Sequence, residues 1–134
     1  PVTPEDERLH AKERVLGVIV DGEAKLYRFD ALGDKATAVL QDKVNDLPIV
    51  IFGSESDNYM VAFRSELADG TNLTFEAVQG EDAIVASDNE GNQWTVFGQA
   101  VSGPRKGQHL QSTDSYIGYF FSWGAFYPDA AIVE

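Results

Sequence analysis

RVLGVIVDGEAKLYRF, residues 14–29, is the stretch that decides the fold. Two runs rich in β-branched and aromatic residues lie on either side of the turn Asp21-Gly22-Glu23. An Asp-Gly step between such runs is a strong signal for a β-hairpin, because the tight turn needs residues that tolerate positive φ. The sequence therefore predicts two antiparallel strands at the start of the folded domain.

Short strand-like runs continue along the chain. Tight-turn residues separate them, among them Ala68-Asp69-Gly70 and the cluster at 88–92. Short strands at close spacing favour an antiparallel sheet or a barrel over a doubly wound α/β fold. The further predicted strands are 48–52, 59–64, 71–78, 82–87, 93–101 and 130–133.

One internal segment, 34–44, has the pattern of a short amphipathic helix. Its apolar residues recur at helical spacing, and Asp34 is placed to cap the first turn. We therefore expect a mainly β (α+β) fold: an antiparallel sheet or barrel-like core, one short internal helix and a C-terminal aromatic helix. Residues 1–13 are predicted to form a polar N-terminal arm, and 14–134 a single mainly-β domain.

Composition narrows the possible partners. The chain carries 22 acidic and 10 basic side chains, a formal net charge of −12, so it repels nucleic-acid backbones and anionic membranes. No stretch reaches the roughly 20 apolar residues that span a bilayer. The chain has no cysteine, which removes disulfides, thiolate metal sites and cysteine nucleophiles. We expect no nucleic acid partner, no membrane span and no cofactor.

The C-terminal part of the chain is unusually aromatic. Seven of its fifteen aromatic residues lie between Tyr116 and Tyr127, and 115–128 has no charged residue. As a helix over 115–127, this segment would have apolar side chains around roughly 220° of its surface, whereas a surface helix commonly has a stripe of about 100°. We therefore expect one side of it to contact something other than water. The predicted interface residues are Tyr116, Tyr119, Phe120, Trp123, Phe126 and Tyr127.

Three explanations of this segment remain open. The strand-rich body and the N-terminal arm would wrap the helix completely, or its exposed part forms a protein–protein interface. Interface centres are enriched in Tyr, Trp and Phe, and large exposed apolar patches are rare in monomers. A stacking platform for sugars or other ring-bearing ligands is the third explanation.

The first hairpin and a later stretch together resemble a known family. The later stretch has the pattern W…G-x-A-x-x-G-P-x-x-G-x-x-L, and between the two lie the proline-led PIVIF at 48–52 and the runs VAFR and LTFEAV. In this order, from about Arg14 to Val133, they resemble the bacterial domain-of-unknown-function family 3179. The residues of the later pattern are Trp94, Gly98, Ala100, Gly103, Pro104, Gly107 and Leu110.

The resemblance implies an exported protein whose polar signatures have been lost. The family carries a W-H-E-x-x-N-D segment and a C-P-L-C-G segment. Counted from Pro48, the two cysteines fall on Ser54 and Asp57, and the tryptophan and histidine fall on Ala36 and Thr37. Serine and aspartate cannot exchange disulfides. If the family has a thiol-dependent function, this member should lack it.

Two polar clusters are candidate binding sites. Ser54, Glu55, Asp57 and Asn58 follow a predicted buried strand, and their oxygens would suit a hard cation such as calcium. A solvated turn is the alternative explanation, because such residues are common in turns. Arg105 and Lys106 concentrate positive charge and are a possible anion site; a solvated loop or an intersubunit ion pair is the alternative.

The sequence offers no convincing acid–base pair. His10 and His109 are the only histidines, and no G-x-S-x-G elbow surrounds Ser54. We therefore expect a non-catalytic structural or interaction subunit of an extracytoplasmic assembly, joined to a protein partner or to itself through the aromatic segment. A small-ligand or divalent-cation binding module and an enzyme with an unrecognised site are the alternatives.

Overall fold

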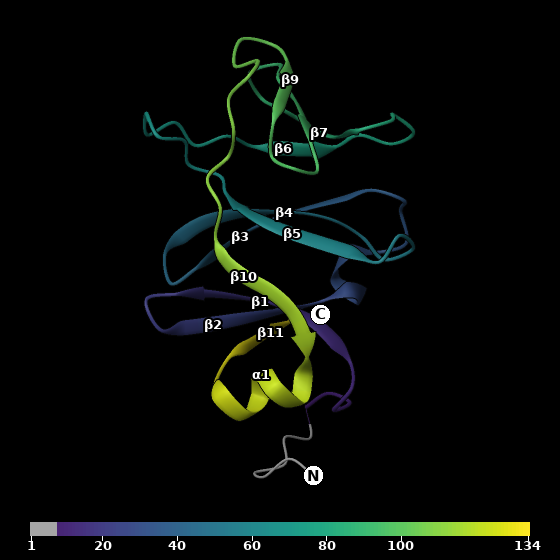
Figure 1. Cartoon of the computed structure of the whole chain (residues 1–134), viewed down its shortest axis with the longest axis vertical. Coiled ribbons are helices and arrows are strands. Elements are labelled where there is room, and N and C mark those ends of the chain that lie inside the picture. Colours follow the sequence, from purple (N-terminus) through teal and green to yellow (C-terminus); the bar gives the residue numbers. More distant parts are fainter. Residues whose placement is uncertain (1–7) are drawn as a thin grey trace.

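Three β-sheets are stacked along the long axis of the molecule in a computed structural model of the chain (Figure 1). The structure describes residues 8–134, so residues 1–7 of the predicted polar arm lie outside it. All strand pairs are antiparallel except that of β11 with β2. The mainly β, antiparallel prediction is confirmed. In the described part of the chain, each sheet is open, so the barrel alternative is wrong.

The first sheet has the strand order β10-β1-β2-β11. The predicted hairpin forms its centre, with Val20 opposite Glu23 and positive φ angles at Asp21 (51°) and Gly22 (81°). Two successive positive φ angles twist the turn in the sense that matches the strands. Its strands are β1 (Arg14–Val20), β2 (Glu23–Arg28), β10 (Asp114–Tyr119) and β11 (Ala131–Val133).

The predicted helix over 34–44 is wrong, because this segment contains strand β3 (Ala38–Val44). β3 lies between two other layers and buries side chains on both faces: Ala38 and Val44 pack toward the first sheet, and Val39 packs toward the third. Burial on both faces removes the simple apolar–polar alternation of a strand. The apolar residues of 34–44 then match the spacing of a helix only by coincidence. The internal helical turn is instead η1 (Phe29–Leu32), a 3-10 helix.

The middle sheet has the order β3-β4-β5, with β4 (Leu47–Ser54) at its centre and β5 (Tyr59–Arg64) at its edge. Four consecutive residues of β4, Ile49 to Phe52, have no exposed surface. Ile49 and Ile51 pack toward the first sheet, and Val50 and Phe52 toward the third. The middle sheet is therefore the shared core of the molecule.

The third sheet lies at the end of the molecule opposite α1 (Figure 1). Phe75 and Trp94 pack against Phe52 of the middle sheet in one apolar cluster. The predicted strand 71–78 is shorter in the structure, and the prediction of one strand over 93–101 is wrong, because a turn at 96–98 divides this segment into two strands that pair with each other. The strands are β6 (Phe75–Ala77), β7 (Ile84–Asp88), β8 (Gln93–Thr95) and β9 (Ala100–Ser102).

The C-terminal aromatic helix is confirmed, but it begins later than predicted. Residues 114–119 form the edge strand β10, and only α1 (Phe120–Phe126) is helical. Tyr and Ile favour strands, and β10 pairs with β1 over its whole length. The helix starts where the backbone N–H groups of Phe120 and Phe121 donate to the carbonyls of Glu13 and Ala11 (2.8 and 2.9 Å). Among residues 8–134, no helix has the length and apolar character needed to cross a bilayer.

Candidate interaction surface

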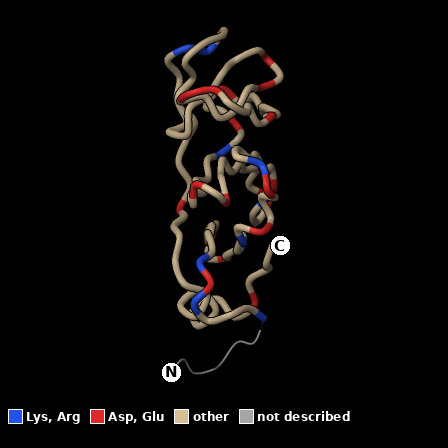
Figure 2. Tube along the Cα trace, turned by 90° about the vertical axis from the view of Figure 1, so that its right-hand side faces the viewer, with Lys and Arg blue, Asp and Glu red and all other residues tan. Residues whose placement is uncertain are grey.

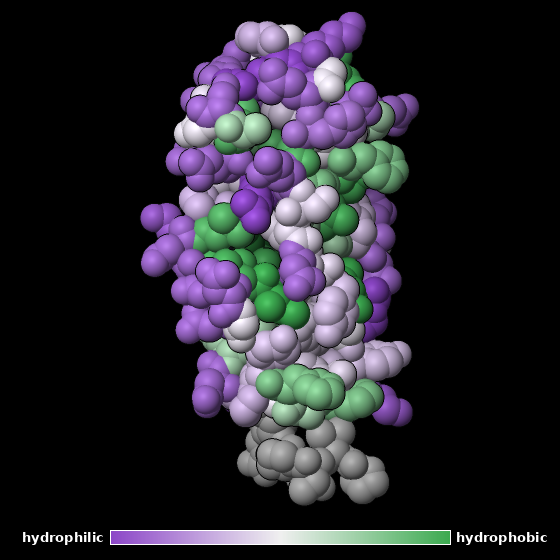
Figure 3. All heavy atoms as spheres, turned by 60° about the vertical axis from the view of Figure 1, so that its left-hand side comes forward, coloured by the Kyte–Doolittle hydropathy of each residue, from purple (hydrophilic) through white to green (hydrophobic). Residues whose placement is uncertain are grey.

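Four aromatic side chains are exposed together around α1. Tyr116, Tyr119, Phe121 and Phe126 have 55%, 49%, 37% and 79% of their surface accessible, and we call them the aromatic surface. The chain that runs into and through α1 carries almost no charge (Figure 2), and an apolar patch lies at this end of the molecule, apart from the larger apolar area at mid-height (Figure 3). This segment therefore differs in charge from the acidic chain as a whole.

A buried indole, that of Trp123, supports Tyr116 of the aromatic surface. Trp123 is 2% exposed, and a Cβ atom at Gly17 on β1 would overlap its ring. The ring of Tyr116 stacks on the Trp123 indole with centroids 4.4 Å apart, and Tyr127 lies on it at 5.7 Å. Tyr119 and Phe121 stack separately at 5.9 Å. Tyr116, Tyr119 and Phe121 are thus supported by neighbouring rings, which lowers the entropy lost when a partner covers them.

The six predicted interface residues divide into two groups. Tyr116, Tyr119 and Phe126 are exposed, and Tyr127 is half-buried. Phe120 and Trp123 are core residues that pack with Val15 and Leu26 of the first sheet, so a partner cannot reach them on the surface. Sequence reasoning left Phe121 out of the predicted interface. Assigning faces to a helix over 115–127 could not identify Phe121 as exposed, because the segment is a strand up to Tyr119.

One buried donor at this surface has no acceptor. In the part of the chain that the structure describes, Nε1 of Trp123 is the buried side-chain atom without a hydrogen-bond partner. It lies 3.2 Å from the position that a Cβ atom on Gly118 would take. An unsatisfied buried N–H is unusual in a native protein and calls for an explanation.

The predicted cation cluster forms the turn between β4 and β5. The Oγ atom of Ser54 is buried and accepts the backbone N–H of Asp57 (3.0 Å), and Oδ1 of Asn58 accepts from Nη1 of Arg14 (2.7 Å). Glu55 and Asp57 are exposed at the tip. The described residues contain no group of three or more His, Cys, Asp or Glu side chains arranged to hold a metal ion.

The predicted anion site has its main cation already paired. Arg105 contacts Glu90 at 2.6 Å and Asp69 at 3.1 Å. The hydrogen bond to Glu90 and then the charges of both carboxylates raise the pKa of Arg105 further above its ordinary value, although desolvation opposes this. An anion at Arg105 would have to compete with both carboxylates, whereas Lys106 is exposed.

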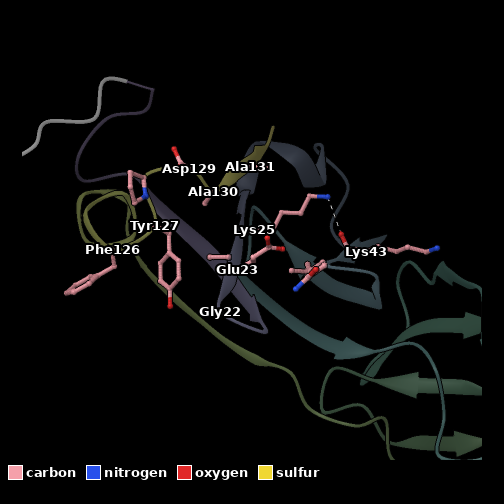
Figure 4. Close-up of a pocket in the computed structure, with 13 residues that line it drawn as sticks. Gly22, Glu23, Lys25, Lys43, Phe126, Tyr127, Asp129, Ala130 and Ala131 are labelled. Atoms are coloured by element: carbon pink, nitrogen blue, oxygen red, sulfur yellow. Dashed lines mark hydrogen bonds between the residues drawn. The ribbon is translucent and has the colours of Figure 1, made fainter.

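A cavity of about 560 Å³ lies beside the aromatic surface (Figure 4). Three segments that are distant in the sequence line it: 22–25, 43–45 and 126–131. Tyr127 points toward the hairpin turn at Gly22, whereas Phe126 points away from it (Figure 4). The ammonium group of Lys25 is bonded to Asp42 (2.8 Å) and to the carbonyl of Lys43 (3.2 Å). No sequence signal could have found this cavity.

The fold and this surface define a mainly-β domain of three stacked sheets with an exposed aromatic end. The chain belongs to the family described as "Protein of unknown function (DUF3179)", whose model matches residues 1–130. The family resemblance is thereby confirmed. Neither a curated protein nor a solved structure matches the chain.

Proposed function

We propose that this protein is a non-catalytic interaction subunit of an extracytoplasmic assembly, and that the aromatic surface is the contact it makes there. The observation that carries the proposal is the exposure of Tyr116, Tyr119, Phe121 and Phe126 at the α1 end of the molecule, where Tyr116 stacks on the buried Trp123. Covering such side chains stabilises a complex by about 25 cal/mol per Å² of apolar surface removed from water. The location outside the cytoplasm rests on the family resemblance.

Association with a protein has more support than ligand binding or catalysis. A small-ligand or divalent-cation binding module has weaker support, because Asn58 and Ser54 already accept hydrogen bonds and Lys25 beside the cavity is paired with Asp42. An enzyme with an unrecognised site has no named acid–base pair to support it. The negative charge elsewhere keeps the free subunit soluble until the aromatic surface is covered.

The matched control for this proposal is Phe97, which is 82% exposed in the third sheet's loop at the opposite end of the molecule. The double variant Tyr119→Asp/Phe126→Asp should fold like the native protein but lose association. The Phe97→Asp variant should keep it. Association is measured by light scattering of the purified protein, and by comparing which proteins of the native source each variant retains. Equal association of both variants would contradict the proposal.

A further inference from the structure

Strand β10 has an uncovered outer edge. It is the terminal strand of the first sheet, in the order β10-β1-β2-β11. In Figure 1 it lies in front of β1, and no described segment lies in front of it. Its residues Tyr116 and Tyr119 belong to the aromatic surface. An inference about this edge therefore rests on the proposed function and adds to it the identity of the partner.

The backbone groups that face outward can be assigned. The bond from Phe120 N to Glu13 O (2.8 Å) continues the β1–β10 register, in which Arg14 lies opposite Tyr119. Hydrogen-bonded and non-hydrogen-bonded pairs alternate along antiparallel strands. The N–H and C=O groups of Gly118 and Tyr116 therefore face β1.

The groups of the alternate residues, Ser115, Ile117 and Tyr119, point away from β1. Among residues 8–134, no backbone group outside the first sheet bonds to Ser115 or Ile117. The N–H of Tyr119 is also free of such a bond, whereas its carbonyl, at the N-cap of α1, accepts the first bond of the helix.

This edge lacks the features that protect the other sheet edges. β3, an edge of the middle sheet, carries Asp42 and Lys43, and β6, β9 and β11 have only three residues each. The other edge of the middle sheet, β5, is partly covered by the chain before β10, because Arg64 N–H donates to the carbonyl of Gln111 (2.8 Å) and Phe63 pairs with Ser112. β10 has six residues, pairs without a bulge, and has neither proline nor charge from Ser115 to Tyr119. An edge strand of this kind is a template for pairing with another strand.

We propose that the partner is a second copy of this chain, whose β10 pairs antiparallel with β10 so that Ile117 lies opposite Ile117 of the second copy. In this register, Ser115 lies opposite Tyr119 of the second copy, so the outward N–H groups of Ile117 and Tyr119 donate to the carbonyls of Ile117 and Ser115 of the second copy. This register pairs the three outward-facing residues among themselves.

The side chains fit this register. On the face toward α1, Tyr116 lies opposite Gly118 of the second copy in a non-hydrogen-bonded pair, where side chains approach most closely. The indole of Trp123 and the ring of Tyr116 in the same copy already cover Gly118 on this face, because a Cβ atom there would lie 3.2 Å from Nε1 of Trp123 and 3.6 Å from the Tyr116 ring. Gly118 adds no side chain of its own, so the Tyr116 ring of the second copy meets the stacked rings of Tyr116 and Trp123.

Charge also permits two copies to meet at this edge, although each carries a net charge of −12. The paired residues 115–119 are uncharged, so an uncharged partner strand matches them. Asp114, at the start of the strand, lies opposite Phe120 of the second copy. The two Asp114 carboxylates are then about six residues, or ~20 Å, apart. This separation exceeds the screening length of about 8 Å at physiological salt.

The test compares Tyr119→Pro with Tyr119→Ala. Both variants lack the ring, but only proline lacks the outward N–H. Residue 119 has φ −72°, which proline adopts, and its N–H makes no bond to β1. We expect the dimer dissociation constant of Tyr119→Pro to exceed that of Tyr119→Ala by about tenfold or more, because each dimer loses two hydrogen bonds. Equal constants would contradict the pairing.

Residue-resolved amide exchange of the native protein is the second measurement and needs no variant. We expect the amides of Ser115, Ile117 and Tyr119 to exchange more slowly at about 1 mM than in dilute solution. A monomer at about 1 mM, or a dimer in which these three amides still exchange as in dilute solution, would overturn the inference. A different result would contradict the proposed function: the double variant Tyr119→Asp/Phe126→Asp would retain every protein partner that Phe97→Asp retains.

Discussion

The indole ring of Trp123 lies against the Cα atom of Gly17, where any side chain on residue 17 would overlap it. This contact joins α1 to β1 and sets the height of the helix above the first sheet. The ring of Tyr116 stacks on the same indole, with ring centroids 4.4 Å apart. The position of the aromatic surface therefore depends on a glycine that is distant from it in the sequence.

Replacing Gly17 with alanine should displace Trp123 and loosen α1. Forcing a methyl group into a packed site costs about 1–3 kcal/mol of unfolding free energy. Thermal unfolding should show the loss, and tryptophan fluorescence should shift to the red as Trp123 meets water. In a Trp123→Phe background the red shift should disappear, because Trp94 is buried in the third sheet. Unchanged melting and emission in Gly17→Ala would contradict this account of the helix position.

Acid should weaken the contact between the first and middle sheets. The Oη atom of Tyr27 donates to Oδ2 of Asp42 (2.7 Å), and Lys25 contacts the same carboxylate (2.8 Å). Burial raises the pKa of Asp42, but the hydrogen bonds from Lys25 and Tyr27 outweigh burial and lower it below 3.8. Because the pKa is lower in the folded protein, this stabilisation is complete above 3.8 and is lost as the pH falls through the folded value.

The Tyr27→Phe variant tests this linkage. It should lose about 1 kcal/mol of unfolding free energy at neutral pH and depend less on pH in the acid range, because Asp42 then has one donor fewer. Chemical unfolding between pH 2 and 7 measures both effects. If the unfolding free energy of the variant depended on pH as that of the native protein does, the hydrogen bond from Tyr27 would not lower the pKa of Asp42.

Asp88 should be essential to the third sheet. Its carboxylate accepts hydrogen bonds from Nε1 of Trp94 (2.7 Å) and from Nδ2 of Asn92 (2.9 Å), and Asn92 is fully buried. Asp88→Ala leaves both buried donors without an acceptor, which should cost about 2–4 kcal/mol. Urea unfolding of this variant is compared with that of Asp129→Ala, an exposed aspartate whose loss should change stability by less than about 0.5 kcal/mol. Similar midpoints for the two variants would refute the role of Asp88.

Calcium should leave the melting temperature unchanged, in both the native protein and Asp57→Ala. The oxygens of Asn58 and Ser54 are engaged by Arg14 and by the turn backbone, so a cation at Asp57 would have to break these hydrogen bonds. Thermal unfolding with calcium and with a magnesium control measures the effect. Stabilisation by calcium that Asp57→Ala abolishes would favour the cation-binding function instead.

The strand pattern was predictable wherever one face of a strand meets solvent or a turn has a strong signal. The Asp21-Gly22 hairpin is such a case. β3 was not predictable, because contact of both its faces with other sheets removes the alternation on which sequence reasoning depends. The helix limits at 120–126 were also missed, since pairing with β1 draws Tyr116 and Ile117 into a strand.

The aromatic composition of the candidate site was evident, but the exposure of its individual rings was not. Trp123 can be buried because residue 17 has no side chain, and no local sequence pattern connects residues 17 and 123. The residues that carry the family resemblance have structural roles in the third sheet. Trp94, Ala100 and Leu110 are core residues, and Gly98 has a φ of 75° where a Cβ atom would press on Phe63.

The most direct test of the aromatic surface is photo-crosslinking in the native source, with benzoylphenylalanine placed at Phe126 and, in a second protein, at Phe97. Both side chains are highly exposed, but they lie at opposite ends of the molecule. The account predicts a discrete crosslinked product from residue 126 and none from residue 97. No product from residue 126, or the same products from both positions, would contradict the claim that this protein makes its contacts through the aromatic surface.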